Sequence, residues 1–338
     1  MAVYTVLEQS EIETLLESFG LGTLMHFEGV PQGVENTNYF LTIDPAPSPG
    51  QLSRSPRHYV LTLFESLPMA TLEFYVELLG RLAQRGLPVP APVPDIQGVA
   101  LHCLRDRPAL ITPRFPGSHA MQPGPAHCAA IGGVLADLHR TGAELDLELS
   151  RASHRDFLWL AQTTEQVLPH LEPTDRNMAE ELLSELQQLI DRQQDLPCGL
   201  VHGDLFRDNA LFIDQRLTGV VDFFSAGPGI LLYDLAVAVN DWCFDANSQL
   251  RRQQAAAMLA AYCSRRPLSE IEREWWPALL RLAAFRFWIS RLAARHITRP
   301  ARPRGALVEL KNPEEYRQRL LQHRRYQHEA LPDALALP

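Results

Sequence analysis

The chain has 338 residues, of which 46% are hydrophobic and 21% are charged. These are ordinary values for a globular protein, and they exclude a fibrous or wholly disordered chain. The formal net charge is −9, from 31 basic and 40 acidic residues. An acidic balance does not favour binding to the phosphates of a nucleic acid, so we expect no nucleic-acid partner. The length predicts one large domain or two lobes.

The cysteines and the first 20 residues indicate the compartment. The five cysteines lie at least 20 residues apart, which fits neither a zinc site nor a disulfide framework and favours reduced thiols. The first 20 residues contain four glutamates and no basic residue, unlike a signal or transit peptide. No apolar stretch reaches the roughly 18 residues that a membrane span needs. We therefore expect a cytoplasmic protein with no membrane partner.

The first 115 residues predict a small lobe of mixed structure. Ser10 followed by Glu13 is a capping-box pattern that predicts the start of a short helix. Apolar residues at helical spacing predict the main helix of the lobe at residues 69–85, and a proline-rich loop is expected at 44–56. Strands are predicted by alternating or β-branched residues at 24–27, 36–43, 58–64, 99–104 and 109–115.

The rest of the chain is mainly helical in pattern. Helices are predicted at residues 126–141 and 174–194, and a nearly continuous helical region at 248–299, with short loops and strands at 198–233. Three strands, a helix and two strands followed by helices are the order of elements in kinases. We therefore expect an α+β, protein-kinase-like bilobal fold with an antiparallel sheet in the small lobe. The predicted parts are a small lobe at 1–112, a helical lobe at 113–328 and a tail at 329–338.

One short stretch contains residues typical of phosphoryl transfer. Residues 201–209 read Val-His-Gly-Asp-Leu-Phe-Arg-Asp-Asn, an H-x-D-x-x-x-x-N pattern, and Asp222 follows Asn209 by thirteen residues. Protein kinases have this spacing between their catalytic loop and their metal-binding segment. Such a reaction needs a carboxylate near the attacking hydroxyl, and an amide oxygen and a second carboxylate on Mg²⁺. Asp204 is therefore the candidate base, and Asn209 and Asp222 are candidate Mg²⁺ ligands. Turn formation is the alternative for Asp204 and Asn209.

Two further polar residues in this region are interpreted as supports of the loop. His202 is expected to brace the loop by hydrogen bonding and to take no part in the chemistry. Asp234 lies in a Tyr-Asp-Leu-Ala stretch and is interpreted as a cap and loop brace at the start of a helix.

These motifs resemble those of the aminoglycoside phosphotransferase and choline kinase superfamily. Within it, the chain is most similar to the bacterial homoserine kinases. This resemblance implies transfer of a phosphoryl group from ATP, with Mg²⁺, to L-homoserine, giving O-phospho-L-homoserine and ADP in threonine biosynthesis. A choline, aminoglycoside or sugar-type acceptor is the alternative. The segments that carry the resemblance are 33–40, 61–65, 202–209, 221–223, 233–236, 240–244, 286–292 and 311–316.

The nucleotide-binding region departs from the superfamily pattern. Thr62 stands in the third strand where a lysine is expected to hold the ATP phosphates, and no G-x-G-x-x-G motif is present. A nucleotide-binding pseudokinase is therefore a further alternative. Backbone N–H groups and polar side chains are expected to meet the phosphates instead, although turn formation is the alternative for residues 36–38. The nucleotide-binding candidates are Gly33, Asn36, Thr37 and Asn38 and, near the predicted hinge at 112–117, Thr112, Arg114 and Phe115.

Charged residues of the helical lobe are candidates for the acceptor. Arg286 lies beside apolar positions of a helix predicted at about 274–299, where a buried cation needs an anionic partner. That partner is either the substrate carboxylate or the acid of a structural salt bridge. Arg291 of the same helix is a second candidate for the carboxylate, and Asp241 is a candidate for the substrate ammonium group. The sequence makes no prediction of the oligomeric state.

Overall fold

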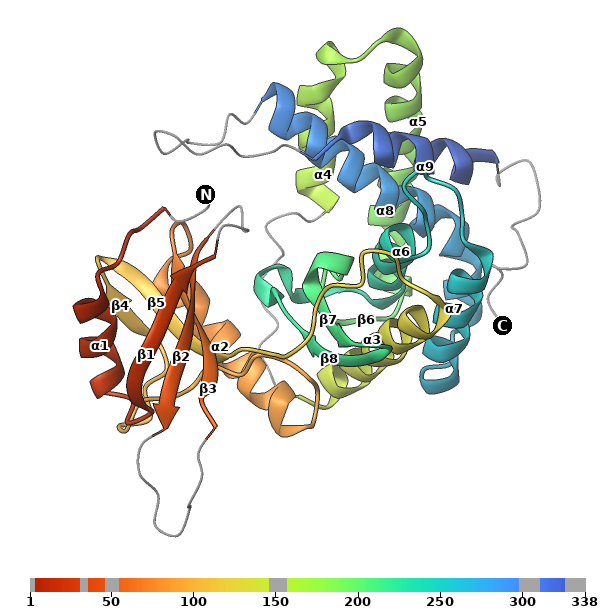
Figure 1. Cartoon of the computed structure of the whole chain (residues 1–338). Coiled ribbons are helices and arrows are strands. Elements are labelled where there is room, and N and C mark those ends of the chain that lie inside the picture. The colour runs from red at the N-terminus through yellow and green to blue at the C-terminus, as the bar shows by residue number, and fades with distance from the viewer. Residues whose placement is uncertain (1–3, 31–35, 46–54, 146–156, 298–310, 326–338) are drawn as a thin grey trace. The chain divides into compact units, whose positions relative to one another are not determined.

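The computed structural model describes residues 4–30, 36–45, 55–145, 157–297 and 311–325 (Figure 1). The chain divides into two compact units, one ending at Phe115 and the other beginning at Pro116. Gly33, the predicted tail at 329–338 and most of the proline-rich loop lie outside the described residues. No helix in the part of the chain that is described has the length and hydrophobicity to cross a membrane.

The first unit is built on one antiparallel sheet, with strands in the order β1-β2-β3-β5-β4. The predicted succession of three strands, a helix and two strands is confirmed, although the fourth strand is shorter than expected. The strands are β1 (Gly22–Gly29), β2 (Asn36–Pro45), β3 (Arg57–Phe64), β4 (His102–Leu104) and β5 (Arg107–Pro113). The helices are α1 (Gln9–Glu17) and α2 (Met69–Gln84).

The first helix starts earlier than the sequence pattern predicts. Glu8 precedes the first helical residue, and the Glu11 carboxylate accepts a hydrogen bond of 2.8 Å from the Glu8 backbone N–H. Ser10 is already helical, and Glu13 instead accepts a hydrogen bond from the Gln9 side chain. The capping-box prediction for Ser10 and Glu13 is therefore wrong. Glu8 and Glu11 have the same three-residue spacing, and they form the capping box instead.

Side chains alternate between the two faces of the sheet, and one face forms the core of the unit. Leu41, Ile43 and Leu61 are fully or almost fully buried on this face. They belong to one apolar cluster with Ile12 and Leu16 of α1. Burial of these side chains holds the helix against the sheet and leaves the opposite face for other contacts.

The second unit consists of helices and two small two-stranded sheets. The helices are α3 (Pro125–Glu144), α4 (Phe157–Val167), α5 (Pro173–Arg192), α6 (Leu231–Trp242), α7 (Arg252–Arg265), α8 (Glu270–His296) and α9 (Pro313–Arg325). One sheet pairs β6 (Cys198–Val201) with β9 (Gly227–Ile230), and the other pairs β7 (Ala210–Ile213) with β8 (Arg216–Val220).

The helical region predicted at 248–299 is two separate helices. The chain leaves α7 at Arg266, and the next residue is Pro267, which has no N–H to donate within a helix. Ser269 and Glu272 then form a capping box, in which the Glu272 carboxylate accepts from the Ser269 N–H at 2.9 Å. The nearly continuous helical region predicted at 248–299 is therefore confirmed, and the Ser-x-x-Glu pattern at 269–272 begins its second helix.

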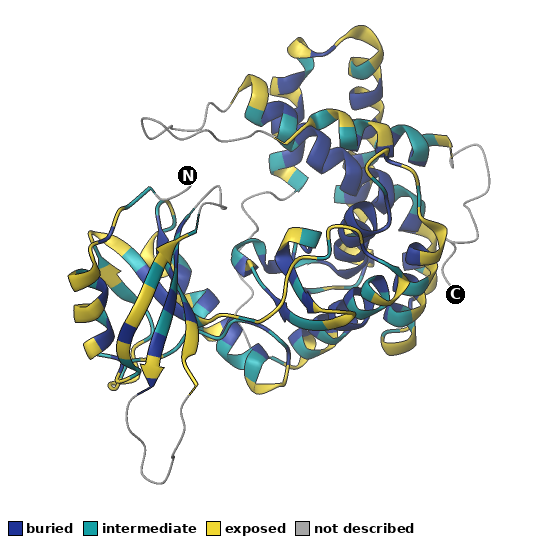
Figure 2. Cartoon of the chain, viewed as in Figure 1, coloured by how far each residue is buried: buried dark blue, intermediate teal, exposed yellow. Residues whose placement is uncertain are grey.

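Helix α6 is buried on nearly every side and supports the region of the candidate site. Apolar residues surround its axis, as expected for a helix in the interior of a large unit. It packs against α8, where Phe285 and Ile289 have no exposed surface. Figure 2 shows the buried residues gathered on these inner helices. Polar residues on α6, among them Asp234 and Asp241, are therefore held by a rigid element.

Candidate active site

The H-x-D-x-x-x-x-N pattern forms a loop, residues 202–209, that follows β6 directly. Gly203 has a φ of +77°, in the left-handed region that favours glycine. A Cβ atom at this position would lie 2.9 Å from the backbone oxygen of Ser225. Only glycine fits here without strain, and this tight turn precedes Asp204.

Asp234, in the first turn of α6, holds the start of this loop. Its two carboxylate oxygens accept hydrogen bonds from the backbone N–H groups of His202, at 2.7 Å, and Gly203, at 2.8 Å. His139 of α3 lies 3.1 Å from the same carboxylate. Burial alone would raise the pKa of Asp234, but these hydrogen bonds hold it below its usual value. A charged carboxylate therefore ties the loop to α6.

His202 connects the loop to the segment that contains Asp222. Its Nε2 atom lies 3.1 Å from the backbone oxygen of Val221, and its Nδ1 atom lies 3.3 Å from the backbone nitrogen of Asp204. The Val221 carbonyl can only accept, so the hydrogen atom of the ring is assigned to Nε2, and Nδ1 accepts from Asp204. Burial lowers the pKa of His202, which keeps the ring neutral in this arrangement.

Asn209 and Asp222 are brought to the loop by further backbone contacts. The side-chain N–H of Asn209 donates to the backbone oxygen of Asp204 at 2.8 Å, and the backbone oxygen of Asn209 accepts from Val221 at 2.9 Å. Asp222 follows with a positive φ of 61°, an uncommon conformation for a residue with a side chain. The three residues of the predicted motif are thus linked within one hydrogen-bonded assembly.

The environment of Asp204 changes the properties of its carboxyl group. Burial raises the pKa of Asp204, and the positive charges of Arg286 and Lys311 oppose this shift. Arg286 is 5% exposed and lies 4.4 Å from the ring centre of Phe287. Its Nη1 atom donates to the backbone oxygen of Gly203 at 3.2 Å. Arg286 therefore contacts the loop itself, one residue before Asp204.

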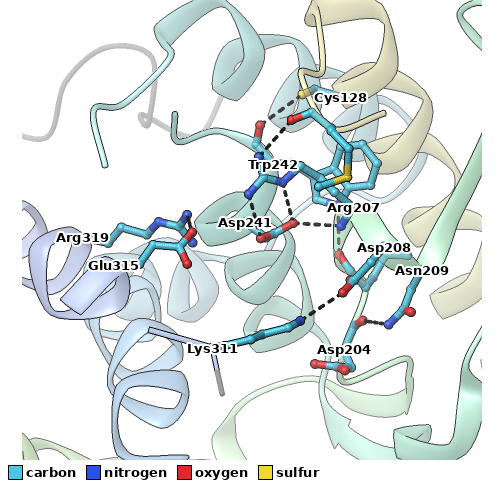
Figure 3. Close-up of polar contacts among 12 residues, drawn as sticks. Cys128, Asp204, Arg207, Asp208, Asn209, Asp241, Trp242, Lys311, Glu315 and Arg319 are labelled. Atoms are coloured by element: carbon cyan, nitrogen blue, oxygen red, sulfur yellow. Dashed lines mark hydrogen bonds and ion pairs between the residues drawn. The ribbon is translucent and has the colours of Figure 1, made fainter. Parts of the chain in front are cut away.

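Arg207 and Asp241 form a second connection between the loop and α6 (Figure 3). One Asp241 oxygen accepts from the backbone N–H of Arg207 at 2.8 Å and from its Nε at 3.1 Å, and the other oxygen accepts from Nη2 at 3.3 Å. The next residue of α6, Trp242, donates from its indole to the backbone oxygen of Leu205 at 2.9 Å. The start of α6 thus holds the first residues of the loop, and the end of α6 holds Leu205 and Arg207.

Two pairs involve residues near the start of α9. Lys311 Nζ lies 3.0 Å from a carboxylate oxygen of Asp208, and both side chains are about half exposed. Arg291 of α8 donates to the Glu315 carboxylate at 2.7 Å and to the backbone oxygen of Asn312 at 2.6 Å. Arg291 is therefore paired with an acid of this chain. Asp241 is likewise paired with a base of this chain, Arg207.

The nucleotide-binding candidates of the first unit are divided between the two faces of its sheet. Asn38 lies opposite Thr62 and accepts a hydrogen bond of 2.7 Å from its hydroxyl. Thr112 lies on the same face, opposite Val60, and Arg114 stacks 3.5 Å above the ring of Phe40 on that face. Asn36 shares the face of Asn38 by alternation along β2, and Phe115 is the last residue of the unit.

Thr37 lies on the opposite, core face. It has no exposed surface, and its hydroxyl accepts from the backbone N–H groups of Tyr4 and Thr5 at 2.9 and 3.1 Å. The same hydroxyl donates to Glu65 at 2.7 Å. The structure therefore separates Thr37 from its two asparagine neighbours and uses its side chain to hold the N-terminal segment.

The sequence of this chain is similar to those of known phosphotransferases. Residues 26–271 match the family described as the Phosphotransferase enzyme family. The chain belongs to this family. Relatives include homoserine kinases of Pseudomonas aeruginosa, 38% identical over 95% of this chain and 96% of the relative, and of Polaromonas naphthalenivorans, 42% identical over 89% and 92%. The homoserine kinase of Cupriavidus taiwanensis is 38% identical over 100% and 99%.

Solved structures share the fold of this phosphotransferase chain. The amicoumacin kinase hAmiN has a TM-score of 0.66, with 14% identity and coverage of 98% of this chain and 96% of its own. A choline kinase from Cryptosporidium parvum has a TM-score of 0.61, with 11% identity over 95% and 96%. At these identities the likeness shows the fold alone, and the predicted α+β, protein-kinase-like class is confirmed.

Several residues of this family member contact the loop but were not predicted from the sequence. His139 and Arg207 bind the carboxylates at the two ends of α6, and Lys311 pairs with Asp208. Arg207 and Lys311 lay within segments that resemble the homoserine kinases, but no pattern indicated what they contact. His139 is 95 residues from its partner Asp234, so only the folded chain brings the two together.

Proposed function

We propose that this chain is an ATP-dependent homoserine kinase, which converts L-homoserine and ATP to O-phospho-L-homoserine and ADP in threonine biosynthesis. Membership of the phosphotransferase family supports the type of reaction. One observation carries the choice of acceptor: three homoserine kinases are 38–42% identical to this chain over at least 89% of it. The choline and aminoglycoside alternatives rest only on shared fold, at identities below 20%.

Asp204 is the proposed base for the acceptor hydroxyl. Its backbone N–H is bound to His202 and its backbone oxygen to Asn209, so the main chain on both sides of the carboxylate is held. A base whose pKa is raised accepts a proton more readily, provided that the group is still ionised at the working pH. Burial of Asp204 supplies the rise, and the nearby charge of Arg286 limits it.

Asn209 and Asp222 are the proposed ligands of Mg²⁺. The amide nitrogen of Asn209 is already bound to Asp204, so the amide oxygen is the atom available to a cation. Oxygen donors suit Mg²⁺, which commonly takes one or two protein groups and completes its shell with phosphates and water. Among the described residues no group of three or more His, Cys, Asp or Glu is arranged for a metal, and the proposed site offers Mg²⁺ one amide and one carboxylate. Bound Mg²⁺ would neutralise charge on the β and γ phosphates.

The remaining candidates are proposed to bind the two substrates. Asn36, Asn38, Thr112, Arg114 and Phe115 are proposed to contact the nucleotide, with Gly33. Thr37 is proposed to assist through the backbone of β2, since its hydroxyl is bound within the unit.

On the acceptor side we keep Arg286, Arg291 and Asp241 as proposed substrate-binding residues. All three lie on α6 or α8, within contact of the 202–209 loop or of the residues beside Lys311. Arg286 is the strongest of the three, because no carboxylate hydrogen bond to its guanidinium is found among the described residues. His202 and Asp234 are proposed to position the loop.

A coupled assay of ADP release tests the proposal. The purified chain is supplied with ATP, Mg²⁺ and one acceptor at a time: L-homoserine, L-serine, choline or an aminoglycoside. We expect kcat/KM to be highest for L-homoserine. A higher value for choline or the aminoglycoside would replace the proposed acceptor. Binding of ATP without turnover of any acceptor would favour the pseudokinase.

A further inference from the structure

Lysine is almost absent from this chain. Of its 31 basic residues, 30 are arginines and one, Lys311, is a lysine. The two side chains are not equivalent: an arginine presents a broad planar fork, whereas a lysine presents a compact charge on a flexible stem with three donors. All the remaining basic side chains are arginines, so the chain has a single side-chain ammonium group, and the position of that group is informative.

The only lysine lies beside the proposed base. Its ammonium group is 3.0 Å from a carboxylate oxygen of Asp208 in the 202–209 loop (Figure 3). It also lies 5.5 Å from the ring centre of Phe206 in the same loop. Its positive charge also opposes the effect of burial on the pKa of the Asp204 carboxyl group. Lys311 is 107 residues from Asp204 in the sequence, so the fold brings it to this loop from the segment before α9.

A purely structural role explains this placement poorly. The side chains of Lys311 and Asp208 are 56% and 50% exposed, and ion pairs of this kind contribute little to stability. An arginine would form the same pair with a more favourable fork geometry. The exposed ammonium is thus free to exchange Asp208 for an incoming anion at small cost.

The other cations around the loop are more buried than Lys311, and each already contacts a group of the protein. Arg207 is bound to Asp241 through two of its nitrogens, and Arg291 is bound to Glu315. Arg286 is buried and donates to a backbone oxygen. Among these four described cations, Lys311 combines the greatest exposure with a single weak partner.

We propose that the Lys311 ammonium binds an oxyanion of the reactants next to Asp204. The oxyanion is either the carboxylate of homoserine or the phosphoryl group in transfer, since both are anionic oxygen groups that meet near the base. This inference rests on the proposed function. Lys311 is then a substrate-contacting residue, and Asp208 holds its ammonium in place when no anion is bound.

Steady-state kinetics with two acceptors distinguish the two sources. L-Homoserine is compared with 3-aminopropan-1-ol, which keeps the hydroxyl and amine but lacks the carboxylate. Lys311→Met is expected to lower kcat/KM for homoserine about 10- to 100-fold, as expected for loss of a charged hydrogen bond. An unchanged value for the aminoalcohol would identify the carboxylate as the ligand. An equal loss for both acceptors, carried by kcat, would identify the phosphoryl group.

Three variants serve as comparisons. Arg192→Met is the matched control, because Arg192 is also half exposed, pairs with an exposed acid, Asp195, and lies 5.8 Å from an aromatic ring; its activity is expected to equal wild type. Lys311→Arg is expected to recover only part of the loss, and full recovery would overturn the need for an ammonium. Asp208→Asn is expected to have a smaller effect than Lys311→Met. Equal effects would mean that Lys311 acts only through Asp208.

The single lysine also permits a measurement that does not depend on turnover. Reductive ¹³C-methylation labels only Lys311 and the N-terminal amine, so each gives its own NMR signal. The Lys311 signal is expected to shift on addition of homoserine alone or of a non-hydrolysable ATP analogue with Mg²⁺. An active wild-type enzyme with no shift of this signal and a fully active Lys311→Met variant would overturn the inference and leave the proposed function intact. No turnover of homoserine by the wild type would instead overturn the proposed function.

Discussion

At Asp204, burial and a neighbouring charge act on the same carboxyl group in opposite directions. Burial raises its pKa, whereas the guanidinium of Arg286 favours the ionised form and lowers it. The group is useful as a base only where it is still ionised, so the balance of the two effects sets the acid limit of activity. Substitution of Asp204 tests its role as the base, and substitution of Arg286 tests the effect of the neighbouring charge.

Replacement of Asp204 by asparagine removes the proton acceptor and keeps the shape of the side chain. Asp204→Asn is expected to lower kcat by at least about 100-fold, the usual contribution of a positioned base, with little change in the affinity for ATP. Single-turnover kinetics and ATP titration measure the two quantities. Asp214→Asn, at an exposed turn with a φ of +53° that asparagine also tolerates, is the control. An active Asp204→Asn variant would show that another group is the base.

Replacement of Arg286 by methionine removes the positive charge that opposes the effect of burial. The pKa of Asp204 should then rise, because the ionised form loses its favourable partner. Activity requires the ionised form, so the acid limb of the pH profile of kcat/KM is expected to move to higher pH. A limb that stays in place or moves to lower pH would contradict the assignment of that limb to Asp204.

At the level of elements, α6 holds the 202–209 loop in position through hydrogen bonds. Asp234 near its start binds the first residues of the loop, and Asp241 and Trp242 at its end bind Arg207 and Leu205. Because the helix is buried on nearly all sides, these groups have little freedom to move. The position of Asp204 therefore depends on a helix that begins 27 residues further along the chain.

The turn at Gly203 leaves little room for a larger residue. Gly203→Ala combines a positive φ with a Cβ atom 2.9 Å from the Ser225 backbone oxygen, and it is expected to lower the free energy of unfolding by about 1–3 kcal/mol. Activity should fall as well, because Asp204 is the next residue. Gly86→Ala is the control: its φ is +85°, but a Cβ atom there meets nothing within 4 Å. Equal losses of stability and full activity in both variants would show that the contact with Ser225 is unimportant.

At the level of the whole molecule, binding of the proposed cosubstrate should stabilise the folded chain. A ligand at 100 times its dissociation constant adds about 2.7 kcal/mol to the free energy of unfolding. ATP with Mg²⁺ is therefore expected to raise the melting temperature by a few degrees, and EDTA should reduce this rise. Asp222→Ala should lose the Mg²⁺-dependent part of the rise and the Mg²⁺-dependent turnover. A variant that keeps both would exclude Asp222 as a metal ligand.

Local patterns were sufficient to predict most elements of the fold. The strands of the first unit and helix α2 follow from alternation and from helical spacing, which depend on residues a few positions apart. The start of α1 was predicted at the wrong residue. Two pairs with the same spacing, Ser10 with Glu13 and Glu8 with Glu11, lie there, and the second pair forms the capping box.

The sequence by itself determined the fold class, the likeness to the homoserine kinases and the identity of Asp204, Asn209 and Asp222 as candidates, because these depend on residue types at short and constant spacing. Only the tertiary structure decided which groups surround them. The contacts of His139 with Asp234 and of Lys311 with Asp208 join residues about 100 positions apart. The packing of α3 against α6 brings the first pair together, the packing of α9 against α8 brings the segment of Lys311 to the loop, and no local pattern encodes either.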